Sequence, residues 1–381
     1  MPSDTEYIRL ALRLAQRADG LTSPNPMVGA VLVKHRRILG RGWHHRAGKP
    51  HAEIEALNDA ARKGNSPKGA TLYVTLEPCC TRGRTPPCTE AIIAAGVRRV
   101  VLGATDPNPE HCGRGLRLLR RAGLAVTEGV LAGECLALNE AFNHWIVHRT
   151  PFVTVKAAMT LDGKIATADG ESKWITGEPA RSCGMKLRHA SDAILVGINT
   201  ILADDPSLTY RGPGGAANPQ KRLRRIILDS QARTPLKAKL VTDADRSLTT
   251  VVVSRLAPAS RVQALRKRVN VWVAPAGRRR GPGRRAGIDL RWVCRRLGSE
   301  GVTSLLVEGG GEVNASVLLE GRAHRVAFFY APKILGGRKA RPAVGGEGAR
   351  TLQEMIALTE IKWLRVGRDW LLTARCEGNK T

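Results

Sequence analysis

Apolar residues in the first third of the chain follow two spacings, one typical of helices and one typical of strands. From Tyr7 to Ala18 they recur every three or four positions, as on the buried face of an amphipathic helix. The segments Val28–Val33 and Ile38–Trp43 flank a short polar turn, which predicts a hairpin of two strands. Further helices are predicted at His51–Ala61, Thr89–Ala95, Gly113–Arg121 and Val130–His148, and further strands at Ala70–Thr75 and Arg99–Gly103. Strands that alternate with helices indicate a layered α/β domain.

The pattern restarts near Pro151, because proline disfavours helix at the residue before it. We therefore predict two domains, 1–148 and 149–381, and the second again alternates strands with helices. Its predicted strands are Phe152–Ala158, Ala193–Val196, Arg225–Leu228, Thr249–Ser254, Val269–Ala274 and Ser304–Val307. Its predicted helices are Pro179–Arg188, Arg261–Arg268 and Leu290–Leu297. Residues 212–220 and 277–287, rich in glycine, proline or arginine, are predicted to be surface loops.

Length and composition agree with two globular domains, since 381 residues can bury two cores and 43% of the residues are apolar. No stretch approaches the roughly 18–20 consecutive apolar residues of a membrane-spanning helix. The first residues, Met1–Glu6, lack the basic and apolar regions of a secretory signal. We expect a cytoplasmic protein with no membrane partner.

The formal charge of +28, from 61 basic and 33 acidic side chains, favours anionic partners. Nucleic acid is one candidate, and a small substrate that carries a phosphate is the other. Aromatic residues make up only 4% of the chain, and they are the stacking platforms that single strands need. We therefore expect a phosphorylated substrate and no nucleic-acid partner.

Three of the eight cysteines, Cys79, Cys80 and Cys88, fall within ten residues. Disulfide frameworks are typical of small secreted domains rather than of long cytosolic chains, so the close trio indicates metal ligation. The remaining cysteines are expected to be ordinary thiols, and they are Cys112, Cys135, Cys183, Cys294 and Cys376.

One histidine and one glutamate could form a catalytic zinc site together with these thiols. His51 opens a predicted helix, and a histidine with two thiolates and one water forms a tetrahedral zinc site of the catalytic type. Zinc lowers the pKa of its water toward about 7, and Glu53 can move protons without ligating the metal, as in zinc deaminases. On chemistry alone His44 and His45 could also be ligands, although we expect them to line the pocket or to be structural.

The cysteine spacing resembles that of one family. Most zinc deaminases have two residues between the cysteines, whereas eight separate Cys79 from Cys88, as in the deaminase domain of the bifunctional riboflavin biosynthesis enzymes. The segments that carry the resemblance are Pro24–Gly29, Gly42–Gly48, Gly83–Cys88 and Asp106–Pro109. The resemblance implies a cytidine-deaminase-like three-layer α/β/α domain, the zinc ligands His51, Cys79 and Cys88, and Glu53 as the catalytic acid and base. Cys80 competes with Cys79 but breaks the Glu-Pro-Cys match.

A second group of motifs lies in the C-terminal half, at Lys156–Ala166, Gly170–Thr176, Val196–Thr209 and Val307–Glu312. In the last of these, glycines between a strand and a helix let the backbone approach a pyrophosphate, which the helix N-terminus favours. Taken alone, this glycine run fits a plain tight turn better than a nucleotide-binding turn.

Together these motifs resemble the reductase domain of the same enzymes, which has a dihydrofolate-reductase-like α/β fold and uses NADPH. Members of this family commonly form homo-oligomers, usually through the reductase domain, so the resemblance implies a homodimer or a higher homo-oligomer. The resemblance places against NADPH the residues Ala158, Trp174, Thr200, Asp204, Ser230, Gly310, Gly311, Glu312, Val313, Asn314, Ala315 and Ser316. It places against the phosphoribosyl substrate the residues Ser172, Arg188, Leu208, Arg211 and Glu308. The planar guanidinium groups of Arg188 and Arg211 match a phosphate.

The sequence thus predicts a zinc-dependent deaminase joined to an NADPH-dependent reductase. The resemblance implies that 2,5-diamino-6-(5-phosphoribosylamino)pyrimidin-4-one is deaminated and that its ribosyl group is then reduced to ribityl. One alternative is a tRNA-type or single-strand deaminase with a non-catalytic basic second domain, which predicts the short cysteine spacing. Another is a non-catalytic zinc or nucleic-acid-binding protein, which has no need of Glu53.

Overall fold

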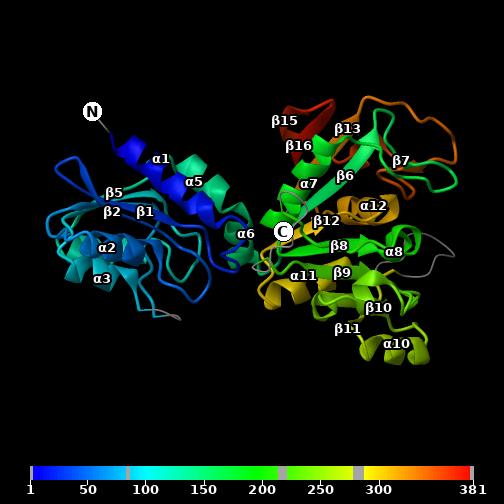
Figure 1. The fold of residues 1–381 in the computed structure, drawn as a ribbon, viewed down its shortest axis with the longest axis horizontal. Coiled ribbons are helices and arrows are strands. Elements are labelled where there is room, and N and C mark those ends of the chain that lie inside the picture. Colours follow the sequence, from blue (N-terminus) through cyan, green and yellow to red (C-terminus); the bar gives the residue numbers. More distant parts are fainter. Residues whose placement is uncertain (1–2, 83–85, 213–220, 278–286, 378–381) are drawn as a thin grey trace. The chain divides into compact units, whose positions relative to one another are not determined.

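The computed structural model describes residues 3–82, 86–212, 221–277 and 287–377. The chain divides into two compact units, Met1–Arg149 and Thr150–Thr381 (Figure 1). Most of the two predicted surface loops, 213–220 and 278–286, lies outside the described residues, as do residues 83–85 of the stretched cysteine motif. Within the described ranges, no helix combines the length and the hydropathy that crossing a bilayer requires.

Unit 1 is built on a five-stranded sheet of order β2-β1-β3-β4-β5. Its strands are β1 (Gly29–Lys34), β2 (Arg37–Trp43), β3 (Thr71–Leu76), β4 (Arg99–Ala104) and β5 (Ala125–Thr127). The predicted β1–β2 hairpin is confirmed, and β3, β4 and β5 run parallel. Six α-helices are described in this unit: α1 (Asp4–Ala15), α2 (Ala52–Arg62), α3 (Cys88–Ala94), α4 (Arg114–Arg121), α5 (Ala132–Leu138) and α6 (Glu140–His148).

Two glycine positions show why helices cover both faces of this sheet. Side chains alternate between the faces of a strand. A Cβ on Gly29 would lie 2.0 Å from the carbonyl oxygen of Ala11 in α1, whereas one on Gly42 would lie 2.3 Å from that of Ala52 in α2. Because Gly42 pairs with Ala30, the neighbour of Gly29, α1 and α2 pack on opposite faces. The expected three-layer α/β/α arrangement is therefore present (Figure 1).

The helix predicted at Val130–His148 is wrong in one respect, because it is interrupted at Asn139. The side chain of Asn139 accepts a hydrogen bond from the Met27 amide at 2.7 Å and donates one to the Met27 carbonyl at 2.8 Å. Its backbone leaves the helical region there, with φ −111° and ψ 24°. A contact with a residue far away in sequence therefore divides one predicted helix into α5 and α6.

Unit 2 contains a nine-stranded sheet of order β11-β10-β9-β8-β12-β6-β13-β16-β15. The strands from β11 to β13 run parallel, and β16 and β15 continue the sheet antiparallel. The bounds are β6 (Phe152–Thr160), β8 (Ala193–Gly197), β9 (Arg224–Leu228), β10 (Thr249–Ser254), β11 (Asn270–Ala274), β12 (Ser304–Val307), β13 (Arg325–Ala331), β15 (Leu358–Val366) and β16 (Asp369–Cys376). A separate pair is formed by β7 (Lys164–Ala166) and β14 (Arg341–Pro342). The six predicted strands are confirmed, whereas β13, β15 and β16 were not predicted.

The helices of unit 2 connect these strands and include α7 (Glu178–Ala190), α8 (Ile198–Asp204), α9 (Lys239–Thr242), α10 (Ala259–Arg266), α11 (Leu290–Ser299) and α12 (Gly311–Leu319). The α/β class predicted for this half is thus confirmed. In a parallel sheet the carboxyl ends of the strands share one edge, where ligands commonly bind. Here α8 follows β8 directly, and α12 begins just after the neighbouring strand β12. Two helix N-termini therefore lie at the same edge of the sheet.

Candidate active sites

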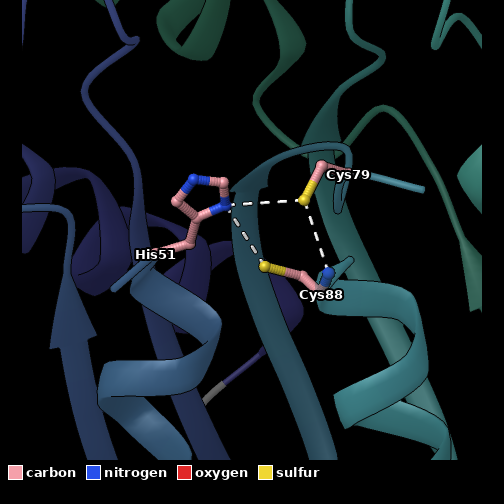
Figure 2. Close-up of side chains that lie close together, drawn as sticks. All are labelled: His51, Cys79 and Cys88. Atoms are coloured by element: carbon pink, nitrogen blue, oxygen red, sulfur yellow. Dashed lines mark hydrogen bonds between the residues drawn. The ribbon is translucent and has the colours of Figure 1, made fainter. Parts of the chain in front are cut away.

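The three predicted zinc ligands of unit 1 come together from three segments. His51 is the N-cap of α2, Cys79 follows β3, and Cys88 is the first residue of α3. The Sγ atoms of Cys79 and Cys88 lie 3.5 Å and 3.3 Å from Nδ1 of His51 (Figure 2). All three ligand atoms lie within 4.8 Å of one another.

This donor set fits a zinc ion. With bonds of roughly 2.0–2.3 Å, the ligands of a tetrahedral zinc lie roughly 3.5 Å apart, which agrees with the measured separations. The Cys88 amide also donates to Sγ of Cys79 at 3.3 Å. Hydrogen bonding from the Cys88 thiol, and less strongly from His51, lowers the pKa of the Cys79 thiol against the opposing effect of burial. Cys79 itself lies in a loop after β3 and receives this amide from the first residue of α3.

Glu53 lies in the first turn of α2 and has only 3% of its surface exposed. Its carboxyl group and the Cys88 thiol lie close enough to affect each other's pKa. Burial, and next the charge of Cys79, raise the pKa of Glu53 to about 7. A carboxyl group beside the ligands but outside the ligand set is placed for proton transfer.

A cavity of about 460 Å³ opens in front of these residues. Its polar lining includes Asn25, His44, Glu77, Thr81, Asp106, Asn108 and His111, and its apolar lining includes Phe142, Trp145 and Ile146. The sequence motifs contained Asn25, Asp106 and Asn108 without assigning them to the site. The spacing of the three α6 residues predicted a helix, and only the fold shows that they line this cavity.

The two other histidines that were possible ligands have different roles. Burial lowers the pKa of His44, so its ring is neutral near pH 7. Its Nδ1 lies 3.0 Å from the Pro50 carbonyl oxygen and therefore donates, which leaves Nε2 to accept from the Asn25 amide at 3.1 Å. His45 packs against the ring of Trp43. Neither histidine belongs to the ligand group, and neither does Cys80.

The predicted NADPH residues of unit 2 gather at the carboxyl edge of the parallel strands. Ala158 lies near the end of β6, Thr200 and Asp204 lie on α8, and Ser230 follows β9. The segment Gly310, Gly311, Glu312, Val313, Asn314, Ala315 and Ser316 covers the N-cap and start of α12. The Gly310 amide donates to Oγ1 of Thr200 at 3.3 Å and so joins two of these elements.

The N-cap and the first residue of α12 are both glycine, for two different reasons. A Cβ on Gly311 would lie 2.2 Å from the Pro342 carbonyl oxygen, so a side chain there would collide with backbone. A Cβ on Gly310 would meet only Oγ1 of Thr200, at 3.8 Å. The space beside Gly310 and the amides at the start of α12 fit a pyrophosphate, which helix N-termini bind. Glu312 and Asn314 hold the neighbouring loop instead, through the Gly346 amide at 3.1 Å and the Ala343 carbonyl at 2.8 Å.

Two of the predicted substrate residues, Arg188 and Glu308, form a bidentate ion pair. Nε and Nη2 of Arg188 donate to the Glu308 carboxylate at 2.8 and 2.9 Å, and Nη1 donates to the Thr209 carbonyl at 3.1 Å. Lys156 Nζ lies 3.6 Å from the same carboxylate. Burial raises the pKa of Glu308, but the charges of Lys156 and Arg188 outweigh it and bring the pKa to about 2.

The other residues of unit 2 that were predicted to bind substrate or cofactor differ in their contacts and in their exposure. Oγ of Ser172 lies 3.5 Å from the Asp204 carboxylate, which brings one predicted substrate residue to one predicted cofactor residue. The side chain of Leu208 is buried in the core, and its backbone has a φ of 50°. Trp174 is 67% exposed and is covered on one side by Arg181, and Arg211 is exposed.

Both units match protein families. Residues 151–372 match the family model of the RibD C-terminal domain, and residues 1–104 match that of the cytidine and deoxycytidylate deaminase zinc-binding region. The riboflavin biosynthesis protein RibD of Actinobacillus pleuropneumoniae is 42% identical over 97% of this chain and 94% of its own length. That of Aquifex aeolicus is 41% identical over 97% of each chain.

Two solved structures resemble the whole chain. Acinetobacter baumannii RibD is 32% identical, with a TM-score of 0.85 over 98% of this chain and 99% of its own. A diaminohydroxyphosphoribosylaminopyrimidine deaminase/5-amino-6-(5-phosphoribosylamino)uracil reductase of Thermotoga maritima is also 32% identical, with a TM-score of 0.79 over 98% of each chain.

Proposed function

The chain belongs to the RibD family of riboflavin biosynthesis proteins, and from this premise we propose which unit and which residues perform each reaction. It is a bifunctional enzyme with zinc and NADPH as cofactors. Its deaminase converts 2,5-diamino-6-(5-phosphoribosylamino)pyrimidin-4(3H)-one into 5-amino-6-(5-phosphoribosylamino)uracil. Its reductase converts that product into 5-amino-6-(5-phosphoribitylamino)uracil. We assign the deaminase to residues 1–148 and the reductase to residues 149–381. A nucleic-acid deaminase is not favoured, because it leaves the match of residues 151–372 unexplained.

The observation that carries the deaminase assignment is the group His51, Cys79 and Cys88 with Glu53 beside it at the cavity. When bound there, zinc would activate the water that attacks the ring carbon bearing the 2-amino group. Glu53 would take a proton from this water and deliver one to the departing ammonia. The cavity walls would orient the pyrimidine ring and exclude other water molecules.

Replacing Glu53 by glutamine tests this assignment, because the amide keeps the shape but cannot carry the proton. Ammonia release should fall by about 10²–10⁴-fold, while bound zinc and NADPH oxidation with the deaminated substrate stay unchanged. Glu55→Gln, on the same turn of α2, serves as the matched control. Ammonia release at the wild-type rate in Glu53→Gln would refute the assignment.

For the reductase, the shared edge of β6, β8, β9 and β12 supports a cofactor site built from the predicted NADPH residues. When bound there, NADPH would supply a hydride to C1′ of the ribosyl group in its ring-opened imine form, and a proton taken up at the imine nitrogen would complete the reduction to ribityl. Ser172, Arg188, Leu208, Arg211 and Glu308 are our proposed substrate residues. In this arrangement Arg188 is already neutralised by Glu308, whereas Arg211 is exposed, so we assign the phosphate contact to Arg211.

An alanine at position 211 tests the phosphate contact. The KM for the phosphorylated substrate should rise, whereas the KM for NADPH should not change, because only the phosphate loses a charged partner. Arg246→Ala removes another exposed arginine of unit 2 and is the matched control. An unchanged KM for the substrate in Arg211→Ala would contradict the assignment.

We also propose that the protein is a homodimer formed through unit 2. Among the described strands, β15 is an edge of the nine-stranded sheet, and edge strands readily pair with another chain. Its exposed side chains include Ile361, Trp363 and Leu364, and Trp363 and Trp370 border an apolar hollow of about 500 Å³. Apolar side chains gathered at an open edge favour a second copy. Light scattering should give twice the chain mass for the wild type and a monomer for Trp363→Asp.

Two further proposals concern location and partners. We propose a cytoplasmic location, because the eight cysteines, all within the described residues, form no disulfide, and disulfides are typical of secreted chains. We propose no nucleic-acid partner, since the phosphorylated pyrimidine substrate accounts for an anionic ligand.

A further inference from the structure

The side chain of Glu77 is buried beside the zinc site, yet the chemistry of deamination does not use it. It lies two residues before Cys79, just after β3, and is 4% exposed. Its two carboxylate oxygens accept three backbone amides, from Asp106 at 3.2 Å, Gly113 at 2.9 Å and Gly115 at 3.0 Å. Hydrogen bonds to an ionised carboxylate are stronger than those between neutral groups.

The three amides belong to the segment that forms one wall of the cavity. Asp106, Asn108 and His111 all line it. Oδ1 of Asp106 accepts the Asn108 amide at 2.9 Å, and Oδ1 of Asn108 accepts the Glu110 amide at 3.1 Å. The positions of these polar side chains therefore depend on Glu77, whose carboxylate accepts the hydrogen bond from the Asp106 amide.

The other end of this segment is held at a helix N-terminus. Gly113 is the N-cap of α4, and Gly115 lies in its first turn, where the helix dipole favours a negative charge. Gly115 also has no room for a side chain, because a Cβ would lie 2.4 Å from the Pro78 carbonyl oxygen. Glycine at this position lets α4 approach the zinc-binding loop closely enough to reach Glu77.

A second hydrogen bond joins the same two segments on the C-terminal side of Cys79. Oγ1 of Thr81 lies 2.9 Å from Nε2 of His111. The wall of the cavity is thus attached to the residues two positions before and two positions after a zinc ligand. Any shift of the wall changes the distance between the polar groups that face the pyrimidine and the metal.

We propose that Glu77 is a positioning residue of the deaminase, which fixes the wall from Asp106 to His111 relative to the zinc ligands. This inference rests on the proposed deaminase function of unit 1. A wall displaced by about 1 Å weakens the polar contacts that bind the pyrimidine, and a displacement of this size can cost on the order of a hundredfold in catalytic efficiency. Because these contacts are lost in the bound substrate as well as in the reacting state, the loss is expected mainly in KM.

The test compares Glu77→Gln with the wild-type full-length enzyme loaded with zinc. Glutamine has nearly the same size, but it replaces one acceptor oxygen with an NH2 group that faces backbone amides. The KM for the diaminopyrimidine substrate should rise by about tenfold to a hundredfold and kcat should change less. Bound zinc and the reduction of 5-amino-6-(5-phosphoribosylamino)uracil should stay at wild-type levels. Glu128→Gln, which changes an exposed acid of the same unit, is the control.

Two more variants separate positioning from a general role in stability. Glu77→Asp keeps the charge and should recover part of the affinity for the diaminopyrimidine substrate that Glu77→Gln loses. Thr81→Val removes the hydrogen bond to His111 and should also raise the KM for this substrate. An unchanged KM in Glu77→Gln overturns the proposal, as does loss of bound zinc that accounts for the whole effect. If Glu77→Gln does not fold, an unchanged KM in both Glu77→Asp and Thr81→Val overturns it. Wild-type enzyme without ammonia release would instead refute the proposed function itself.

Discussion

The ion pair between Glu308 and Arg188 gives a quantitative prediction about the stability of unit 2. The Glu308 side chain is 10% exposed, and it contacts the guanidinium of Arg188 at 2.8 and 2.9 Å and the ammonium of Lys156 at 3.6 Å. Replacing Glu308 by glutamine removes the negative charge and leaves both cations nearly buried without their partner. Such a change is expected to destabilise the folded unit strongly.

The magnitude follows from the pKa of Glu308, which these two cations bring from its usual 4.5 to about 2. At 1.36 kcal/mol per pH unit, the difference corresponds to about 3 kcal/mol of folding free energy. Breaking a buried ion pair costs about 3–5 kcal/mol in other proteins, which agrees. Because the pKa is lowered in the folded state, this stabilisation is complete above pH 4.5 and is lost as the pH falls toward 2.

Urea unfolding followed by tryptophan fluorescence measures the effect, because five of the seven tryptophans lie in unit 2. At pH 7 the unfolding free energy of Glu308→Gln should be about 3 kcal/mol below that of the wild type. Between pH 4.5 and pH 2 the wild type should lose this advantage, while the exposed-acid control Glu171→Gln behaves as the wild type. A loss below about 1 kcal/mol at pH 7, or an equal acid sensitivity of both proteins, would refute the reasoning.

Three shorter predictions follow from other parts of the structure. Removal of zinc by a chelator should abolish ammonia release but leave NADPH oxidation with 5-amino-6-(5-phosphoribosylamino)uracil intact; loss of NADPH oxidation when that uracil substrate is supplied directly would contradict separate sites. Gly311→Ala forces a Cβ to within 2.2 Å of the Pro342 carbonyl, so the KM for NADPH should rise by about tenfold; an unchanged KM would place the cofactor elsewhere. Burial raises the pKa of Cys294 to about 12, so mass spectrometry at pH 8 should find Cys294 unmodified by a thiol reagent while exposed Cys112 reacts; rapid labelling of native Cys294 would show that it is accessible.

The chemistry of the first site was largely readable from the sequence. The types and spacing of His51, Glu53, Cys79 and Cys88 already specify a donor set and a proton carrier, since few other residue types bind zinc. Strand and helix spacing likewise predicted the order of elements along most of both units. These signals are local, because they depend on side-chain periodicity within one segment and on ligands that lie close in sequence.

Tertiary structure alone decided how distant segments combine. Asn139 interrupts a helix that its own sequence favours, because its amide pairs with the backbone of Met27, 112 positions away. Glu308 finds Arg188 because β12 lies between β8 and β6, an order that no periodicity reveals. Glu77 reaches the cavity wall because β3 and β4 are parallel neighbours. In each case a polar side chain is buried, and its burial is tolerated only because a hydrogen-bonding or charged partner lies beside it. The position of that partner is set by the packing of the sheet and its helices, and the local sequence does not reveal it.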